Sequence, residues 1–539
     1  MRNFTSVCMN ISGCIAMLLS CCSVMAENMT GTYYLKAVDF ETVGESAYGN
    51  VYQNGVEITI APPTTQTSWD LVVTNLCGQG TVYGGTLSNN DSTLTLNNVA
   101  YAYFSDRDYS GKGTESLGSA EGTMMGNITI DLNPDGSLSF SDFTVINTLL
   151  GDVPLFTVLA SYKNNVANPV KEYYFSSSED DFTTVTSLDA PSPHGIVYDS
   201  GWGFKVCRYT ENDSYDVEVS GLGGISSCKA YGTLAEDGSI TLTTLSGAYL
   251  SAYEGYSGIG TESLGAADGT ILGGKMYLTL QADGSYEVSD FTAVNTTIAN
   301  GALNSEIMAS WKNGKATPVQ KYHFSASVFT KGEDSPHGVT YPEEFDFTVR
   351  RCIETDNYDV VVTGLCGREG VKSYGTEDSD GNITLSMLSG TYLTPYEGYS
   401  GIGTESLGSA DGAFMGRIVF AAQPDGTFSI GDFTAINMVI DGAPKTTILA
   451  KWEGGNGIPV GNTVAVGDPL SIGTPEVDAT VEMSVENGSF IFGEEVDCRV
   501  WGVDGTLLRS GRLRRVDGLK PGLYIVKANN AGAVKVVLR

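Results

Sequence analysis

The feature that most constrains this chain is a fourteen-residue segment that occurs three times. YSGKGTESLGSAEG at 109–122 returns as YSGIGTESLGAADG at 256–269 and as YSGIGTESLGSADG at 399–412. Other landmarks recur in register with it: an Asp-Phe-Thr triplet, an Ala-x-aromatic triplet and a closing Pro-Val pair. A period of about 140 residues is too long for a solenoid unit and long enough for each copy to bury its own core. The sequence therefore predicts tandem domains at 27–170, 171–319 and 320–460.

Within each repeat the local signals are those of β-strands. Runs such as YDVEV (215–219) and YDVVV (358–362) alternate or are apolar, and glycine-containing turns follow them. Asp283-Gly284 and Asp425-Gly426 separate alternating runs and predict hairpins whose turn residues have positive φ. We expect about eight strands per repeat, closed into a barrel because closure removes both sheet edges.

The order of these strands is similar to that of a known family. It is carried by Tyr322-His323-Phe324, the runs 347–349 and 358–367, and the hairpins 374–385 and 425–436. It resembles the calycin-like (lipocalin-like) β-barrel domains of secreted Bacteroidota proteins, over roughly 30–460. The resemblance implies a barrel with room for a ligand and transfers no catalytic residue. The expected fold is all-β, with three tandem antiparallel eight-stranded barrels followed by a small C-terminal β-sandwich at 461–539.

The first residues indicate export. Arg2 precedes an apolar run at 11–26 that ends in Val24-Met25-Ala26, a pattern typical of a signal peptide spanning 1–26. Leu18 to Cys21 also resembles a lipobox, which would make Cys21 a lipidated anchor. No other segment approaches the length of a membrane-spanning helix, so we expect none in the mature protein.

The last residues of the chain indicate where the protein is delivered. Turn signals at 487–488, 504–505 and 521–522 separate short strands and predict a β-sandwich. The pieces 503–505, 519–526 and 535–539 resemble the C-terminal sorting domain of the type IX secretion system of Bacteroidota. That resemblance implies recognition of 461–539 by the secretion machinery, then release or attachment at the outer-membrane surface. A terminal β-sandwich without that role is the alternative.

Charge excludes two classes of partner. The chain has 30 Lys and Arg against 63 Asp and Glu, a net charge of −33 at pH 7. Nucleic acids and anionic membrane surfaces both need an excess of basic side chains, so neither is expected as a partner. Because 41% of the residues are hydrophobic and only 17% charged, the chain is not a disordered acidic tail either.

The repeated segment is the candidate binding site. Its tyrosines are suited to stacking on a sugar or another flat ligand, and its polar side chains to hydrogen bonding. The candidate ligand-binding residues are Tyr109, Thr114, Glu115, Tyr256, Thr261, Glu262, Ser263, Tyr399, Thr404, Glu405 and Ser406. The alternative is an ordered loop whose glycines hold positive φ and whose leucine plugs the barrel end.

Catalytic and metal-binding patterns are weak. GIGTES at 258–263 lacks the last glycine of a dinucleotide-binding loop, and Ile259 stands where a nucleophile elbow needs glycine. His194 and His337 share a Pro-His-Gly context that is missing from the first repeat, so a histidine-based triad in every repeat is excluded. The carboxylate pairs Glu254/Asp268 and Glu397/Asp411 leave a glycosidase open as a minor alternative. We expect no enzyme activity, cofactor or metal.

Six cysteines follow the leader. An exported protein can form disulfides, and Cys207/Cys228 and Cys352/Cys366 are candidate pairs within single repeats. No Cys-x-x-Cys motif occurs after the leader, which disfavours zinc.

Together these observations predict an exported cell-surface protein that binds a glycan or a small apolar molecule without catalysis. Three similar sites on one chain favour avidity. One alternative is a structural or adhesive surface protein with closed barrels, which large apolar side chains filling each barrel would favour. The other is a hydrolase acting on glycans.

Overall fold

The computed structural model describes most of the chain outside its N-terminal segment. It covers 29–460 except 62, 64–67, 89–91, 98–101, 125, 134, 152, 179, 185–191, 210–213, 254, 387, 397 and 425, and 483–538 except 487–488, 503–506, 517–521 and 529–533. The expected signal peptide (1–26) and Cys21 lie outside these residues. Within them, no helix combines the length and the apolar character that crossing a bilayer requires.

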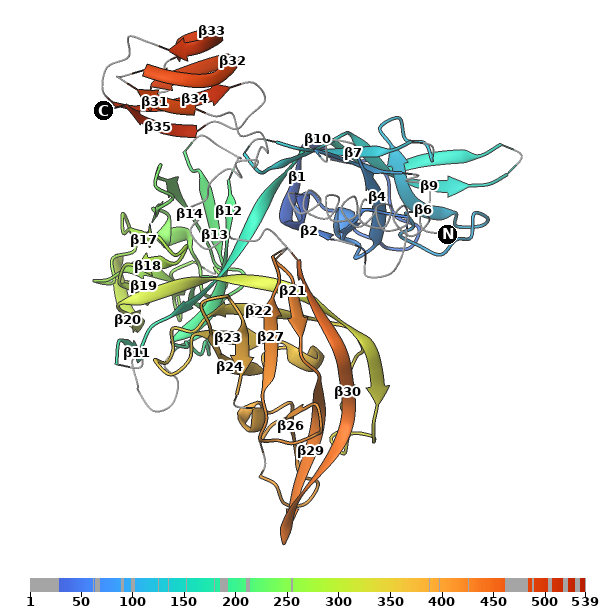
Figure 1. The fold of residues 1–539 in the computed structure, drawn as a ribbon, viewed down its shortest axis with the longest axis vertical. Coiled ribbons are helices and arrows are strands. Elements are labelled where there is room, and N and C mark those ends of the chain that lie inside the picture. The colour runs from blue at the N-terminus through green and yellow to red at the C-terminus, as the bar shows by residue number, and fades with distance from the viewer. Residues whose placement is uncertain are drawn as a thin grey trace, which may run out of the picture. The chain divides into compact units, whose positions relative to one another are not determined.

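The chain divides into two compact units, 1–470 and 471–539. The regular secondary structure described in the first unit is almost entirely β-strand (Figure 1). Short 3-10 turns interrupt the strands at η2 (Leu76–Gly78), η4 (Leu222–Gly224), η5 (Leu245–Gly247), η6 (Leu365–Gly367) and η7 (Leu388–Gly390).

Eight strands of the first repeat close into an antiparallel barrel. In order of pairing they are β1 (Gly31–Thr42), β2 (Val56–Ala61), β3 (Leu71–Thr74), β4 (Val82–Leu87), β5 (Thr93–Leu96), β7 (Ile128–Leu132), β8 (Leu138–Phe140) and β10 (Leu155–Ser176). β10 pairs back onto β1, which completes the circle. Both edges are thereby removed, as the meander pattern predicts.

The same order of pairings recurs along the chain. In the second repeat it runs through β10, β12 (Gly201–Arg208), β13 (Val217–Ser220), β14 (Lys229–Leu234), β15 (Ile240–Leu242), β17 (Met276–Leu280), β18 (Tyr286–Val288) and β21 (Gly314–Lys331), which returns to β10. In the third it runs through β21, β22 (Phe345–Arg351), β23 (Val360–Thr363), β24 (Lys372–Glu377), β25 (Ile383–Leu385), β27 (Ile418–Ala422), β28 (Phe428–Ile430) and β30 (Ala443–Val460), which returns to β21.

Each repeat also carries an antiparallel sheet beside these circles. The strand of the repeated segment pairs with a following strand, and that strand forms a long hairpin with the next. The members are β6 (Thr114–Ser119) and β9 (Phe143–Leu149) with β10; β16 (Thr261–Ala266), β19 (Phe291–Ala299) and β20 (Ala302–Trp311) with β11 (Phe182–Thr184); and β26 (Thr404–Ser409) and β29 (Phe433–Asp441) with β30.

Two long strands join consecutive repeats. The expected boundaries at 170/171 and 319/320 fall inside β10 and β21, each of which pairs with strands on both sides of the boundary. β10 also pairs directly with β21, Tyr173 opposite Pro318. The repeats are therefore connected through shared strands and not through linkers.

The recurring landmarks build the core. Phe143, Phe291 and Phe433 of the Asp-Phe-Thr triplets lie opposite Tyr162, Trp311 and Trp452 of the Ala-x-aromatic triplets. Their rings stack at 4.7, 4.8 and 4.9 Å between centroids. These and other aromatic side chains, including Phe175, Phe324 and Phe347, are almost completely buried. Aromatic rings thus fill the interior of each repeat.

The second unit consists of five antiparallel strands that pair into one sheet: β31 (Met483–Glu486), β32 (Ser489–Gly502), β33 (Leu507–Val516), β34 (Gly522–Ala528) and β35 (Val534–Leu538).

The all-β class and the closed eight-stranded antiparallel barrel are thus confirmed, and the barrel is compatible with a calycin-like fold. One turn differs from expectation. Asp283-Gly284 does separate β17 from β18, but only Gly284 has a positive φ. The turn runs from Gln281 to Gly284, whose N–H donates to the Gln281 carbonyl (3.0 Å), so the glycine is the fourth residue of the turn and not a central one.

Candidate functional site

The repeated segment is a loop over its first five residues, a strand over the next six and a turn over its last three. The loops 109–113, 256–260 and 399–403 are followed directly by β6, β16 and β26. Gly260 closes its loop with an N–H bond to the Ser257 carbonyl (3.2 Å) and has φ +92°. A Cβ at Gly260 would lie 2.6 Å from Asn295 Oδ1, so the loop needs glycine there both for its conformation and for its close approach to β19.

The glutamate of the segment is completely buried. In the second repeat, Ser192 Oγ donates a hydrogen bond to Glu262 Oε1 (2.6 Å) and Tyr198 Oη donates one to Glu262 Oε2. The same Ser192 Oγ accepts the backbone N–H groups of His194 (3.1 Å) and Ile196 (3.0 Å), which fixes a tight turn. The buried carboxylate therefore holds a distant segment against the strand.

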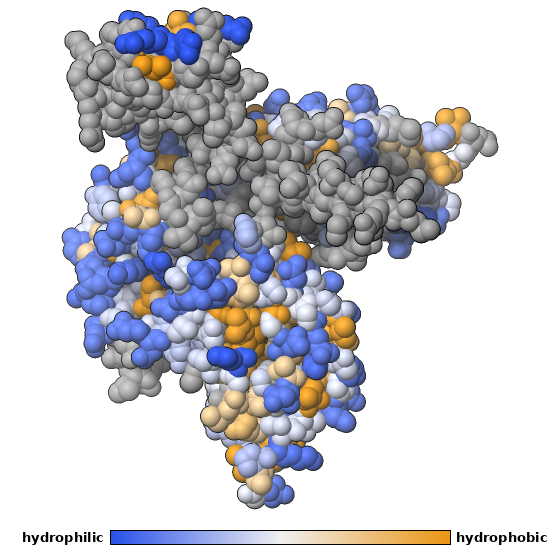
Figure 2. Space-filling view, viewed as in Figure 1, coloured by the Kyte–Doolittle hydropathy of each residue, from blue (hydrophilic) through white to orange (hydrophobic). Residues whose placement is uncertain are grey.

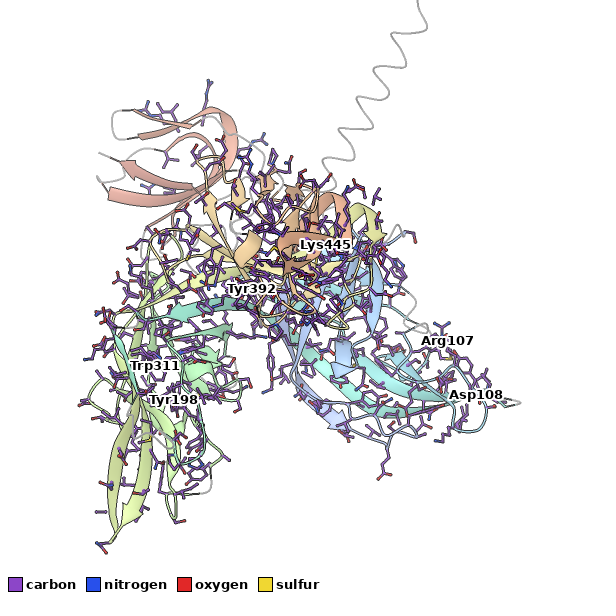
Figure 3. The ribbon with its side chains drawn as sticks, turned by 90° about the horizontal axis from the view of Figure 1, so that it is seen from below. Arg107, Asp108, Tyr198, Trp311, Tyr392 and Lys445 are labelled. Carbon is purple, nitrogen blue, oxygen red and sulfur yellow. The ribbon has the colours of Figure 1, made fainter. Side chains whose placement is uncertain are left out.

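The other repeats make the same contacts. We call 46–53, 192–199 and 335–342 the latch segments. Ser335 and Tyr341 donate to Glu405, and Ser46 and Tyr52 donate to Glu115. Each latch segment is also bonded by its repeat's core aromatic residue: Trp311 Nε1 to the Asp199 carbonyl (2.9 Å), Trp452 Nε1 to the Pro342 carbonyl (3.1 Å) and Tyr162 Oη to the Gln53 carbonyl (3.1 Å). Tyr198 and Trp311 lie side by side, with 5.8 Å between ring centroids (Figure 3).

The Pro-His-Gly histidines belong to this latch. His194 Nε2 lies 3.2 Å from the Gly260 carbonyl, and His337 Nε2 lies 3.0 Å from the Gly403 carbonyl. In the first repeat Tyr48 Oη donates to the Gly113 carbonyl at the corresponding place (2.5 Å). A tyrosine thus replaces the histidine as partner of the same loop carbonyl, which identifies these histidines as loop-holding residues.

Most candidate binding residues are therefore inaccessible to a ligand. Thr, Glu and Ser of the segment are buried in every repeat: Thr114, Glu115, Ser116, Thr261, Glu262, Ser263, Thr404, Glu405 and Ser406. Leu117, Leu264 and Leu407 are fully buried in the repeat cores. The alternative expected from the sequence, glycines with positive φ and a plugging leucine, describes this half of the segment.

The candidate tyrosines lie in clusters near the surface. In the second repeat Tyr253 packs between Tyr249 and Tyr256, with centroids 4.8 and 5.8 Å apart. In the third repeat Tyr396 packs in the same way between Tyr392 and Tyr399, at 4.7 and 5.5 Å. We call these the tyrosine clusters. The central ring is the exposed one, 56% for Tyr253 and 55% for Tyr396.

The first repeat builds this place differently. Tyr109 Oη donates to Tyr103 Oη (3.1 Å), and the Arg107 guanidinium lies 4.3 Å from the Tyr103 ring centroid. Arg107 and Asp108 lie together near the end of the first repeat (Figure 3). An exposed cation therefore covers the ring that the second and third repeats cover with an exposed tyrosine.

Each loop is fastened to the tip of a long hairpin. The carbonyls of Tyr109, Tyr256 and Tyr399 accept the N–H groups of Leu150, Ile298 and Ile440, respectively, at 2.7–2.8 Å. These hairpin residues and the loop residues Ile259 and Ile402 are exposed apolar side chains. On the face drawn in Figure 2, apolar side chains gather in small groups among hydrophilic ones. The tyrosine clusters therefore adjoin small apolar surfaces held on rigid strands.

The expected carboxylate pairs do not form a described site. Glu254 and Glu397 lie outside the described residues. Asp268 accepts the Thr270 N–H (2.9 Å) and Asp411 accepts Ser409 Oγ (2.6 Å), so both cap their own turns. These hydrogen bonds lower the pKa of both exposed carboxyls.

The candidate disulfides are not formed. Cys207, Cys228, Cys352 and Cys366 are free thiols, as is Cys77. Cys228 and Cys366 are buried while Cys207 and Cys352 are partly exposed. Burial raises the pKa of Cys228 to about 12, so it is an unreactive core residue.

Among the residues that the structure describes, no three His, Cys, Asp or Glu side chains are arranged to hold a metal ion. No family model and no curated protein matches the chain.

Sequence reasoning missed the latch serines and tyrosines. Ser192 and Tyr198 lie 70 and 64 residues before their carboxylate partner, so local patterns do not link them. Comparing the repeats would have found them, because Ser-x-x-Gly-x-x-Tyr occurs at 46–52, 192–198 and 335–341.

Proposed function

We propose that this chain is an exported, non-catalytic glycan-binding protein of the cell surface, and that the tyrosine clusters of the second and third repeats are its binding sites. The observation that carries the proposal is the repeated exposed tyrosine, Tyr253 or Tyr396, held between two partner rings. An exposed aromatic face is suited to stacking on the apolar face of a sugar ring, and the neighbouring phenol groups can hydrogen-bond to its hydroxyls.

Rigidity supports the same assignment. The loop that begins with Tyr256 or Tyr399 is anchored by a carbonyl–hairpin bond, a glycine turn and the buried glutamate latch. A ligand that stacks on such a platform causes little loss of side-chain and loop freedom. The net charge of −33 favours neutral or weakly charged glycans over acidic ones.

The proposed localisation is inferred from sequence motifs at both ends of the chain. The apolar run at 11–26 favours export, with lipidation at Cys21 as the alternative, and the C-terminal motifs favour type IX secretion through the outer membrane. The five-stranded sheet of the second unit is compatible with a sorting domain.

A glycan array probed with the full chain tests the binding. We expect binding to a subset of glycans that Tyr253→Ala combined with Tyr396→Ala weakens at least tenfold. Tyr277→Ala is the matched control, because Tyr277 is also exposed (48%) but lies on β17, outside the clusters. Equal losses in the control, or binding unaffected by the cluster variant, would reject the tyrosine clusters as sites.

The filled barrel interior favours a second candidate. Because aromatic rings occupy the repeat cores, a structural or adhesive role with closed barrels fits the same architecture. A full glycan array without any binding, together with adhesion of cells that display the chain, would support this candidate.

A further inference from the structure

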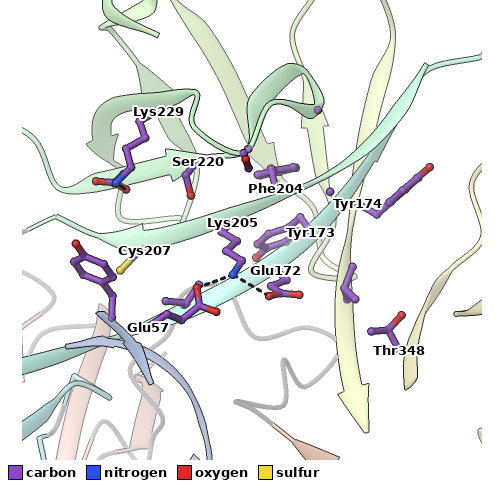
Figure 4. A pocket seen from close by; sticks show the side chains of 18 of the residues that line it. Glu57, Glu172, Tyr173, Tyr174, Phe204, Lys205, Cys207, Ser220, Lys229 and Thr348 are labelled. Atoms are coloured by element: carbon purple, nitrogen blue, oxygen red, sulfur yellow. Dashed lines mark hydrogen bonds and ion pairs between the residues drawn. The ribbon is translucent and has the colours of Figure 1, made fainter. Parts of the chain in front are cut away.

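A cavity of about 740 Å³ lies where strands of the three repeats meet (Figure 4). Its lining comes from β1, β2, β10, β12, β13, β14, β21, β22, β23 and β24 and from the turns beside them. β10 and β21 run through this junction and pair with each other, so the walls are connected by continuous strands. The volume is within the range of cavities that hold small organic ligands.

The lining combines both faces of these strands: Lys205 and Cys207 come from the outer face of β12, whereas the core residues Tyr173 and Phe204 also line the cavity. On β12, Trp202, Phe204 and Val206 are buried, whereas the alternate residues Lys205 and Cys207 face outward. Buried side chains fill the interiors of the strand circles, whereas the junction between the repeats is hollow. The cavity is therefore separate from the tyrosine clusters and independent of the function proposed for them.

Basic side chains are concentrated in the cavity. Six basic residues line it, Lys36, Lys205, Arg208, Lys229, Arg350 and Lys372, against three acidic ones, Glu57, Glu172 and Glu218. The whole chain shows the opposite balance, 30 basic against 63 acidic residues. Two further carboxylates pair with these cations from outside the lining, Asp135 with Arg208 (3.1 Å) and Glu354 with both Arg350 and Lys372 (3.9 Å from Lys372 Nζ). Six basic groups therefore meet five acidic ones, and the site keeps a small local excess of positive charge within an acidic chain.

The basic groups are held in position across the junction. Lys205 Nζ of the second repeat lies 2.6 Å from Glu57 Oε2 of the first and 3.5 Å from Glu172 Oε1 (Figure 4). Lys372 Nζ of the third repeat donates to Tyr174 Oη (3.1 Å).

Aromatic side chains line the cavity beside these cations. The Arg350 guanidinium lies 3.7 Å from the Tyr174 ring centroid, and its side chain is only 4% exposed. Tyr34, Tyr173, Phe204 and Tyr209 also line the cavity. A ligand with an aromatic body would contact rings, and an anionic group on it would meet preorganised cations.

We infer that this junction cavity is a binding site for an amphipathic organic anion, a flat apolar body that carries one carboxylate or sulfonate. Lys205 and Lys372 contact the anionic group, and the tyrosine rings contact the body. The site is built only when the three repeats are joined, because each contributes lining residues.

A pair of fluorescent probes tests the inference on the full chain. Anilinonaphthalene sulfonate carries the anionic group, and phenylnaphthylamine has the same rings without it. We expect saturable one-to-one binding of the sulfonate at the cavity. Lys205→Gln with Lys372→Gln should weaken it at least tenfold while changing binding of the neutral probe less than threefold.

A matched control separates the site from general charge. Lys331→Gln with Lys451→Gln removes two lysines that pair with Asp334 and Glu453 outside the cavity, and it should leave both probes unaffected. If this control weakens the sulfonate as much as the cavity variant does, or if the neutral probe falls as far as the sulfonate, the inference is wrong.

A second variant fills the cavity without removing charge. The nearest atom to a Cβ placed at Gly203 is the Tyr173 carbonyl oxygen at 3.8 Å, so Gly203→Trp has room to project from the outer face of β12. It should abolish binding of both probes while near-ultraviolet circular dichroism shows a folded protein. Undiminished binding by this folded variant, or no binding by the unmodified chain, overturns the site.

Discussion

At the scale of single residues, the repeated segment combines two roles. Tyr256 is partly exposed and packs against the exposed ring of Tyr253, whereas Thr261, Glu262 and Ser263 are buried. A buried carboxylate needs donors, and Ser192 and Tyr198 supply them. Packing alone therefore explains why Thr, Glu and Ser recur in every copy of the segment. Binding is assigned only to the exposed tyrosine rings of the clusters.

Removing one donor from the latch should destabilise the fold. In Tyr198→Phe, the fully buried Glu262 loses one of its hydrogen bonds while its shape is kept, which should lower the free energy of unfolding by about 2 kcal/mol. Urea unfolding of the full chain measures this. Tyr277→Phe, an exposed control, should change it by less than about 0.5 kcal/mol. Equal effects in both variants would contradict the latch.

The loop glycine offers a second residue-scale test with a matched partner. Gly260 and Gly301 both have positive φ, +92° and +78°, but only Gly260 has an atom close to its missing Cβ. Gly301→Ala should cost about 1 kcal/mol from backbone strain, and Gly260→Ala should cost at least about 1 kcal/mol more because Asn295 must move. Thermal unfolding of the two variants would show this order, and the reverse order would refute the close approach.

At the scale of elements, the landmarks read from the sequence have structural causes. In the triplet 290–292, Asp290 accepts the Asn313 N–H (3.1 Å), Phe291 stacks on Trp311, and Thr292 Oγ1 donates to the Ala266 carbonyl (2.9 Å). Each residue type is required, which is why the triplet recurs. Strand alternation and repeated landmarks thus suffice to predict the class and the closed barrel.

Other elements could not be predicted for physical reasons. The sequence predicts β16 to be part of a polar loop because its Thr, Glu and Ser side chains are polar. Their burial is favourable only because hydrogen-bond donors come from a segment distant in the sequence. The repeat boundaries could not be placed either. The sequence predicts that each repeat closes on Pro-Val, but the first two pairs lie inside the continuous strands β10 and β21, and only the third pair lies at the end of a strand, β30.

The buried tyrosines of these elements predict alkaline destabilisation. Burial raises the pKa of Tyr286 to about 12, and burial followed by the bond to Glu262 raises the pKa of Tyr198 well above its ordinary value. Unfolded tyrosine titrates near 10, so the stability from these groups is fully present below pH of about 10 and declines as pH rises further. Melting temperatures from pH 8 to 12 should fall steadily above pH 10. A constant melting temperature up to pH 11.5 would contradict this.

At the scale of the whole molecule, the shared strands couple the repeats. Because β10 and β21 each belong to two circles of pairings, loss of one repeat removes strand partners from the next. Hydrogen exchange resolved to each repeat can monitor the urea unfolding of the full chain. It should show coincident transitions for the three repeats within residues 29–460. Separate midpoints for the three repeats would show that the shared strands do not couple them.

The central claim is that two tyrosine clusters, and not the first repeat, bind glycan. Titration calorimetry with the best array glycan tests it most directly. We expect two sites per unmodified chain, one in Tyr253→Ala, one in Tyr396→Ala and none in the double variant. Arg107→Ala in the first repeat should leave two. A stoichiometry that stays the same in the single variants, or that falls with Arg107→Ala, would contradict the account.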